Sequence, residues 1–468
     1  MSAVDTAWLR MDRPDNLMMI CALITLAEPV DHERLLALIK NRFLRYARFR
    51  KRAVEDERGA YWETDPDFDL DRHVVRTRLS GKGTAAQLQS LLSKLVSKPL
   101  DPAHPRWQFQ VVDNHLGGSA VIMRMHHCYA DGIALTQVLL AMTHDARRKS
   151  LAKPAAQRTA RAGDAAAGIA GVGGSLPNMM KLALKVGETM IERGIAIWQN
   201  PQAAIDLARQ GTAIATEIAK LALMTQDSPT RFKGKPGVTK RVAWAEPLDL
   251  VEVKAVGKLL GASVNDVLLA CVAGALRAYL VDHGDSVRGI SFRALVPVNL
   301  RPPDQALTLG NEFGLVFLDL PIGIESPVRR VEAVRETMGA LKSSYQPVLA
   351  LGLLAAMGAG PKVLQDQLLL QLSRNASAVM TNVPGPQEPL YIAGSKIDQL
   401  LVWVPQSGDI GMGVSVLSYN GKVQFGLLTD RSLCPDPGRI SERFGSEFER
   451  VRTAARRRKR SRRADTEE

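Results

Sequence analysis

The segment 119–132, with the sequence SAVIMRMHHCYADG, constrains the fold more than any other stretch of this chain. Its first half has the apolar, β-rich character of a buried strand, and the final glycine permits a tight bend before an apolar helix start at 133–142. His126 and His127 therefore lie where a strand ends in a turn. Because adjacent strand residues point to opposite faces of a sheet, both histidines cannot face the same substrate atom. We expect one to face the chemistry and the other to be packed or hydrogen-bonded.

Length and composition restrict the class of protein. A chain of 468 residues exceeds one ordinary hydrophobic core, so two domains are expected. A hydrophobic content of 46% and a charged content of 23% are typical of soluble globular proteins. The formal charge of +13 suits a partner that carries phosphates, such as CoA, an anionic membrane or nucleic acid. Much of this charge lies at 456–463, which we interpret as a solvated tail and not as a specific nucleic-acid site.

Cysteine usage and hydropathy indicate the compartment. The four cysteines are far apart and form no CxxC pair, which indicates neither a metal site nor a disulfide framework. A reduced, cytoplasmic compartment is the natural inference. The N-terminus lacks the layout of a secretory signal, and no uncharged apolar run reaches the roughly 18 residues needed to span a bilayer. We expect peripheral contact with the inner membrane face or lipid droplets, without a membrane-crossing segment.

Strand and helix patterns alternate in two blocks, which predicts α/β lobes at 1–150 and 237–450. Between them, 151–236 reads as a linker with amphipathic helices, and 451–468 as a basic disordered tail. The predicted strands are 17–26, 73–79, 107–112, 120–125, 239–243, 295–298, 315–320, 410–419 and 422–428, and the predicted helices outside the linker are 31–50, 85–96, 133–142 and 248–260.

The spacing His-His-x-x-x-Asp-Gly resembles the motif of the bifunctional wax ester synthase/diacylglycerol acyltransferase family, a branch of the CoA-dependent acyltransferases related to chloramphenicol acetyltransferase. Four further stretches match that family in order, although each alone is a helix cap or a rigid loop. They are Ser263-Val-Asn265-Asp266, Val296-Pro297-Val-Asn299-Leu-Arg301, Gly310-Asn311 and Asn382-Val-Pro384-Gly385-Pro386. The resemblance covers most of the chain. It implies two chloramphenicol acetyltransferase-like lobes, each a mixed sheet flanked by helices, with an active-site tunnel between them.

One stretch departs from the family pattern. Family members often have Pro-Leu-Trp before the histidines, whereas this chain has Pro105-Arg106-Trp107. The resemblance implies that this region, with Trp107, bears on acyl or alcohol selection, so the preferred chain length is in doubt. The resemblance also places Asn382, Pro384 and Gly385 at the substrate.

A neutral histidine can remove the proton of an alcohol as the hydroxyl attacks a thioester. We assign this general base to His127. The resemblance groups His126 with it as a catalytic candidate, and we expect the role of His126 to be structural. The resemblance implies that Asp131 pairs with an arginine, for which Arg301 is our candidate. Asn265 is expected to donate a hydrogen bond to the oxyanion or to orient His127; the alternative is that it only caps a helix.

The expected site also includes two glycines and a second aspartate, whereas the remaining histidines are given no role. Gly132 and Gly385 would let backbone approach the tunnel closely, and Asp266 is expected to be structural. The remaining histidines have no metal-ligand spacing, so we expect no metal. We also expect no cofactor, because acyl-CoA is a substrate.

The predicted reaction transfers a fatty acyl group from acyl-CoA to diacylglycerol, giving triacylglycerol, or to a long-chain alcohol, giving a wax ester. One rival is a condensation-type domain of peptide assembly, which uses the same histidine motif. A rival of another class is a non-catalytic lipid or nucleic-acid binder that uses the basic tail. A core histidine pair beside an ordinary Asp-Gly turn is the purely structural alternative.

Overall fold

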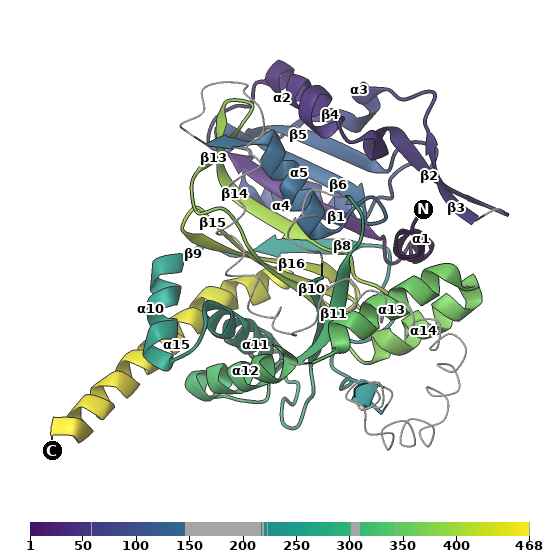
Figure 1. The fold of residues 1–468 in the computed structure, drawn as a ribbon. Helices are drawn as coiled ribbons and strands as arrows, with labels where there is room; N and C mark the ends of the chain where they lie inside the picture. The colour runs from purple at the N-terminus through teal and green to yellow at the C-terminus, as the bar shows by residue number, and fades with distance from the viewer. Residues whose placement is uncertain are drawn as a thin grey trace.

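The computed structural model describes residues 1–57, 59–145, 217, 220, 221, 223–300, 309–342 and 344–467. They form two lobes, each built on a mixed sheet with helices against it (Figure 1). The expected α/β fold class is therefore confirmed. Most of the expected linker 151–236 lies outside the described residues, and so do most of the amphipathic helices that we expected at 180–198 and 205–223 within it.

The first sheet has the order β4-β5-β6-β1-β14-β13-β7. Only β4 and β5 run parallel, and the other neighbours are antiparallel. Its strands are β4 (Val74–Arg78), β5 (Trp107–His115), β6 (Gly118–His126), β1 (Met19–Leu26), β14 (Ser395–Trp403), β13 (Leu390–Ile392) and β7 (His144–Asp145).

Two strands of this sheet come from the segment that we assigned to the second lobe. β14 pairs with β1 from Cys21 opposite Trp403 to Leu26 opposite Ile397, and β13 continues the sheet beyond it. The predicted lobe 237–450 is therefore wrong as a description of the sheets. We predicted no strand at 395–403, and a local sequence pattern does not indicate the partner of such a strand, because pairing is decided by packing between distant segments.

The second sheet has the order β11-β10-β12-β15-β16-β8, with β9 also paired to β16. β12 runs parallel to both β10 and β15. The predicted hairpin between the last two long strands is confirmed. The strands are β11 (Phe313–Asp319), β10 (Arg293–Asn299), β12 (Ala378–Pro384), β15 (Met412–Tyr419), β16 (Lys422–Asp430), β8 (Lys240–Trp244) and β9 (Leu248–Asp249).

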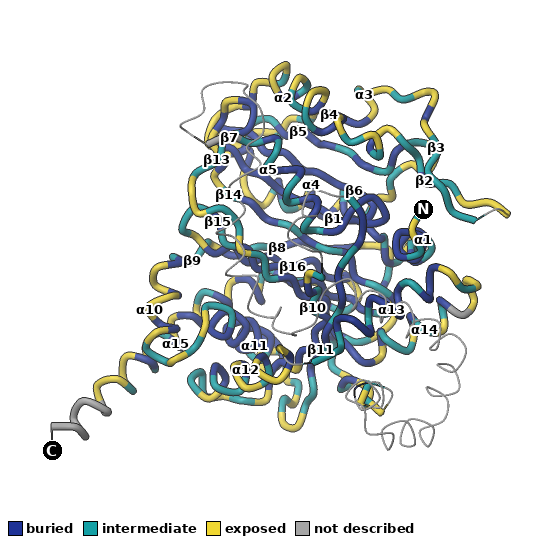
Figure 2. The backbone as a smooth tube through the Cα atoms, viewed as in Figure 1, coloured by how far each residue is buried: buried dark blue, intermediate teal, exposed yellow. Residues whose placement is uncertain are grey.

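Helices bury the faces of both sheets, as the dark strands in Figure 2 show. On the first lobe these are α2 (His32–Leu38), the π-helix η1 (Ile39–Phe43), the 3₁₀ helix η2 (Ala47–Arg50), α3 (Leu70–His73), α4 (Ala85–Val96) and α5 (Gly132–Met142), with a separate hairpin of β2 (Lys51–Asp56) and β3 (Gly59–Thr64). On the second lobe they are α10 (Leu250–Leu260), α11 (Val264–Asp282), α12 (Pro327–Lys342) and α15 (Pro437–Glu467).

The N-terminal helix α1 (Ala3–Arg10) packs on α13 (Gln346–Ala359), with α14 (Lys362–Arg374) beside them (Figure 1). Ser2 caps α1 by accepting the N–H of Asp5. The crossing is close because Gly358 has no side chain. A Cβ on Gly358 would lie 1.6 Å from the carbonyl oxygen of Ala3. Two segments far apart in the sequence are thus fixed against each other.

The alternation of side chains in β6 divides two cores. Val121, Met123 and Met125 belong to the core that includes α1, α5 and α13, whereas Ala120 and Ile122 belong to the core beneath α4. The same alternation continues through His126, the last residue of the strand, to His127 beyond it, and separates the two histidines. The sheet therefore aims His126 and His127 at different surroundings.

The basic C-terminal segment differs from its prediction. α15 continues through Glu467, so the expected disordered tail from 451 is wrong. Val451 and Ala455 are buried in the second core, and arginine and lysine favour helices almost as well as alanine. The anchored helix extends from the body of the protein, as Figure 1 shows.

One helix among the described residues, α11, is long and apolar enough by length and composition to cross a membrane. Within the structure, 72% of its apolar 18-residue stretch is buried, and its side chains form much of the second core.

Candidate active site

His127 lies in the turn that follows β6 and is almost fully enclosed, with 4% of its surface exposed. Its backbone N–H donates to the carbonyl oxygen of Met18 at 2.7 Å, which extends the pairing of β6 with β1 by one residue. The imidazole stacks on Trp8 of α1, with ring centroids 4.0 Å apart and planes at 17°. The ring of Phe313 in β11 also lies against the imidazole, with the two ring centroids 5.6 Å apart. Aromatic contacts from two elements therefore fix the plane of the ring.

Asn311 fixes the protonation of the ring. Its Nδ2 group donates to Oδ1 of Asp5 at 2.8 Å and to the carbonyl oxygen of His127 at 3.0 Å. Both partners are acceptors, so the amide oxygen of Asn311 must face Nδ1 of His127, which lies 2.8 Å away. An acceptor at this distance places the proton on Nδ1 and leaves the lone pair on Nε2.

Asp5 lies behind Asn311 and has 1% of its surface exposed. Its Oδ2 lies 3.5 Å from the guanidinium of Arg48, which also donates to the carbonyl oxygen of Tyr129 at 3.0 Å. Burial raises the pKa of Asp5, while Asn311 and Arg48 oppose that rise. An arginine, a carboxylate and an amide thus form a continuous chain that ends at the imidazole.

Burial lowers the pKa of His127 to about 4, and the charge of Asp131, the hydrogen bond that the ring donates to Asn311 and the contact with its own backbone carbonyl only partly oppose this effect. At neutral pH the ring is therefore uncharged. A neutral imidazole with its lone pair on Nε2 is the form that can accept a proton.

His126 has different partners, as the alternation of strand residues predicts. Its Nδ1 accepts the backbone N–H of Cys128 at 3.2 Å, and its Nε2 lies 3.6 Å from Oδ2 of Asp12. Burial lowers the pKa of His126, and Asp12 opposes that shift. These contacts hold the turn and are consistent with the structural role that we expected.

Asp131 ties the histidine turn to the other lobe. Its Oδ1 accepts the N–H of Ala134 and caps α5, while its Oδ2 accepts the N–H of Glu312 at 3.1 Å. The N–H of Asp131 in turn donates to the carbonyl oxygen of Gly310 at 3.1 Å. Its expected partner Arg301 lies outside the described residues.

The structure joins two of the family-like stretches at Asn265 and Asn382. Nδ2 of Asn382 donates to Oδ1 of Asn265 at 3.0 Å. The helix cap of α11 is Ser263, which forms a reciprocal capping box with Asp266, so Asn265 is free of the capping role that was its alternative. Asp266 takes part in this helix cap, and its structural role at the active site stays a prediction. The bond to Nδ1 of His127 belongs to Asn311 and not to Asn265.

The other predicted residues lie in varied surroundings. Trp107 is a core residue with 1% of its surface exposed, and its indole N–H donates to the carbonyl oxygen of Phe49, a position that disfavours direct contact with substrate. Pro384 is exposed. Gly385 approaches another strand closely, because a Cβ there would lie 2.4 Å from the carbonyl oxygen of Ser418. Apart from its chain neighbours and the backbone of its own helix, no described atom lies within 4 Å of a Cβ built on Gly132, and its place beside the tunnel stays a prediction.

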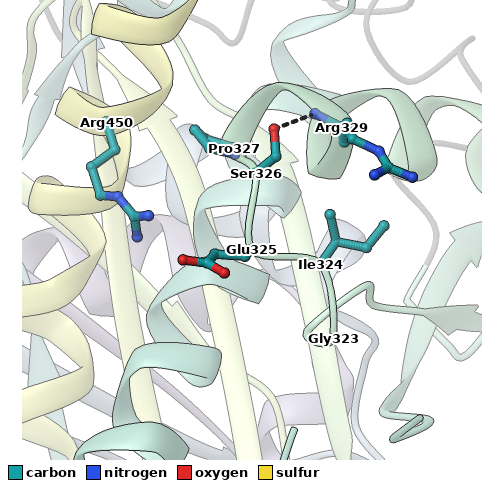
Figure 3. A pocket seen from close by; sticks show the side chains of 7 residues that line it. All are labelled: Gly323, Ile324, Glu325, Ser326, Pro327, Arg329 and Arg450. Carbon is teal, nitrogen blue, oxygen red and sulfur yellow. Dashed lines mark hydrogen bonds between the residues drawn. The ribbon is translucent and has the colours of Figure 1, made fainter. Parts of the chain in front are cut away.

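A surface depression of about 730 Å³ lies elsewhere, between the loop 323–327, Arg329 of α12 and Arg450 of α15 (Figure 3). None of the predicted site residues lines it. Within the described ranges, no three His, Cys, Asp or Glu side chains are grouped as metal ligands, and the absence of a metal stays a prediction.

Sequence reasoning missed the contribution of α1. Asp5 and Trp8 precede the first predicted element, the strand at 17–26, and a buried acid in a short helix gives no periodic signal. Asn311 was visible in the Gly310-Asn311 stretch, but nothing in the sequence indicated its contact with His127.

Comparisons with known proteins identify the family of this chain. Residues 1–268 match the model of the wax ester synthase/diacylglycerol acyltransferase catalytic domain, and residues 309–452 match the C-terminal domain of the same family. The chain is 28% identical to the Mycobacterium tuberculosis protein named "Probable diacyglycerol O-acyltransferase tgs1", over 99% of this chain and 98% of that protein. It is 27% identical to the O-acyltransferase WSD of Acinetobacter baylyi, over 81% and 80% of the two chains.

Solved structures share the fold. The wax ester synthase/diacylglycerol acyltransferase of Marinobacter aquaeolei superposes with a TM-score of 0.67 at 20% identity, covering 96% of this chain and 98% of that one. The first condensation domain of the calcium-dependent antibiotic synthetase superposes with a TM-score of 0.56 at 17% identity, covering 97% of this chain and 95% of that one. The family models together cover most of the sequence, and the chain belongs to the wax ester synthase/diacylglycerol acyltransferase family.

Proposed function

We propose that this protein transfers a fatty acyl group from acyl-CoA to diacylglycerol to give triacylglycerol, and also to long-chain alcohols to give wax esters. The observation that carries the proposal is the state of His127 within a chain of this family. Its Nδ1 is bound by an acceptor and its pKa is low, so Nε2 can accept a proton at neutral pH.

In the proposed reaction, Nε2 of His127 removes the hydroxyl proton as the alcohol oxygen attacks the thioester carbonyl carbon. The tetrahedral intermediate then collapses, the carbon–sulfur bond breaks, and the imidazolium returns the proton to the departing thiolate of CoA. No acyl-enzyme forms, so no nucleophilic side chain is needed. Trp8, stacked on the ring, favours the transient positive charge through its π face.

We assign the oxyanion donor to Asn265, whose contact with Asn382 gives its side chain a fixed orientation. The tunnel between the lobes, with acyl-CoA entering from one side and the alcohol from the other, is part of the same proposal. A fixed donor aimed at the oxyanion is typically worth about 3–4 kcal/mol of the activation barrier.

The proposal includes peripheral work at the inner membrane face or at lipid droplets in the cytoplasm, since both acceptors are amphiphiles. The net charge of +13 supports attraction to an anionic surface. Arg456, Arg457, Lys459 and Arg460 are exposed near the end of α15, whereas Val451 and Ala455 anchor that helix in the core.

The test is CoA release by the purified full-length protein, with palmitoyl-CoA as donor and diolein or hexadecanol as acceptor. His127→Ala is expected to lower kcat by about 10²–10⁴-fold, the usual contribution of a general base. His73→Gln serves as the matched control, because His73 is also buried but bonds to the carbonyl oxygen of Trp107. A His127→Ala protein with the normal rate, or a wild-type protein that releases no CoA with either acceptor, would overturn the proposal.

A further inference from the structure

Two residues outside the histidine motif control the state of His127. We propose that Asn311 and Asp5 are positioning residues, which hold His127 in the tautomer that carries its proton on Nδ1. This inference rests on the proposed function, because it names the groups that keep the general base ready. It assigns α1, at the start of the chain, a part in the catalytic apparatus.

The orientation of the Asn311 amide is fixed from two sides. Nδ2 donates to the carboxylate of Asp5 and to the carbonyl oxygen of His127, at 2.8 and 3.0 Å. A flipped amide would set its oxygen against both of these acceptors and lose two hydrogen bonds in a buried place. Asn311 has 5% of its surface exposed, so water cannot readily replace them.

The fixed amide then selects one tautomer of the ring. With the amide oxygen 2.8 Å from Nδ1, a proton on Nδ1 makes a hydrogen bond, whereas a lone pair on Nδ1 would face another lone pair. In the second tautomer the proton lies on Nε2, so Nε2 has no lone pair with which to accept the proton of a hydroxyl group. An unproductive ring state is thereby excluded before substrate arrives.

Asp5 is held for this task by its own neighbours. Arg48 lies 3.5 Å from its second carboxylate oxygen and balances the buried charge. The close crossing of α1 and α13 at Gly358 keeps the helix that carries Asp5 in place. The same helix presents Trp8, which prevents the imidazole from rotating out of the plane of the Asn311 bond.

Nitrogen chemical shifts of histidine rings test the tautomer without any turnover. The full-length protein, labelled with ¹⁵N only in its eight histidines, is recorded at pH 7, and the His127 signal is assigned by its loss in His127→Gln. The expected pattern is a neutral ring protonated on Nδ1. In Asn311→Leu we expect a mixture of the two tautomers or a majority protonated on Nε2.

Asn16→Leu is the matched control. Asn16 is also a buried asparagine that joins distant segments, but its side-chain amide donates to the carbonyl oxygens of Gly408 and Ile410 and not to His127. The His127 signal should be unchanged in Asn16→Leu, even if the melting temperature falls. A wild-type ring protonated on Nε2, or an unchanged signal in Asn311→Leu, would overturn the inference.

Kinetics provide the second readout. Asn311→Leu should lower kcat by about 100-fold with little change in KM, a typical cost of removing the group that orients a reacting side chain. Asp5→Asn should lower kcat by about tenfold, because the amide of Asn311 keeps one of its two acceptors. The double variant Asp5→Asn with Asn311→Asp restores an acceptor at Nδ1 and should exceed Asn311→Leu in kcat.

Failure of this inference is separable from failure of the proposed function. If His127→Ala is inactive while Asn311→Leu and Asp5→Asn keep the wild-type kcat, His127 is the base but these two residues do not position it. If the wild-type protein transfers no acyl group, the proposed function fails, and the nitrogen shifts still decide whether Asn311 selects the tautomer.

Discussion

A histidine can act as a base only if it is neutral before the reaction, and burial of His127 favours the neutral ring. The lowered pKa of about 4 has a thermodynamic counterpart, because the unfolded chain binds a proton at this residue near pH 6.5. Between these two values the unfolded state carries more protons than the native state. Lowering the pH through this range therefore lowers the unfolding free energy of the protein.

This difference predicts a specific effect of His127→Gln on stability. Between pH 7.5 and pH 4.5 the wild-type protein should lose about 2–3 kcal/mol of unfolding free energy that the variant does not lose. Urea denaturation of both proteins at several pH values measures the difference. If the unfolding free energies of the two proteins change with pH by the same amount down to pH 4.5, the ring is readily protonated in the native state.

Among elements, the crossing of α1 and α13 matters because it positions two side chains near His127. Gly358→Ala should force the helices apart, lower the unfolding free energy by about 1–3 kcal/mol and reduce kcat, since α1 carries Asp5 and Trp8. Thermal unfolding and CoA release measure the two effects.

Gly339→Ala in α12 is the control for that substitution, because nothing lies within 4 Å of a Cβ at Gly339. It should raise the unfolding free energy by about 0.4–1 kcal/mol and leave kcat unchanged. Equal kcat values for the two variants would mean that the position of α1 against α13 has no effect on catalysis.

Elements with a strong local pattern were predictable from the sequence. The helix at 85–96 appears with the predicted bounds, and the strand before the histidines differs by two residues at its start and one at its end. The predicted helix at 31–50 is wrong as one element, because the chain changes there from an α-helix to a π-helix and a 3₁₀ helix. His127 could be recognised from its motif, whereas Asp5 could not, because its role depends on a contact with a residue of the other lobe.

For the whole molecule, the distribution of charge predicts how the protein meets a lipid surface. Replacing Arg456, Arg457, Lys459 and Arg460 with glutamine should weaken binding to phosphatidylglycerol vesicles by about 100-fold or more, at about 1 kcal/mol for each charge. Co-sedimentation at low salt measures this, and 0.5 M salt should release the wild-type protein as well.

The control carries the same change in net charge on exposed residues elsewhere, with glutamine at Lys40, Lys82, Lys94 and Lys98. Its binding should fall much less, if the end of α15 is the contact. Equal loss in both variants would show that only the total charge matters, and no loss in either would remove the electrostatic account of membrane contact.

The pairing of β1 with β14 has a consequence for protein synthesis. A ribosome completes β1 long before it reaches Trp403, so one hydrogen-bonding edge of β1 has no native partner while the intervening chain is made. Uncovered edges recruit other chains. A transcript that stops short of that strand would therefore yield an adhesive fragment, and chaperones that shield nascent chains should govern how much native protein a cell obtains.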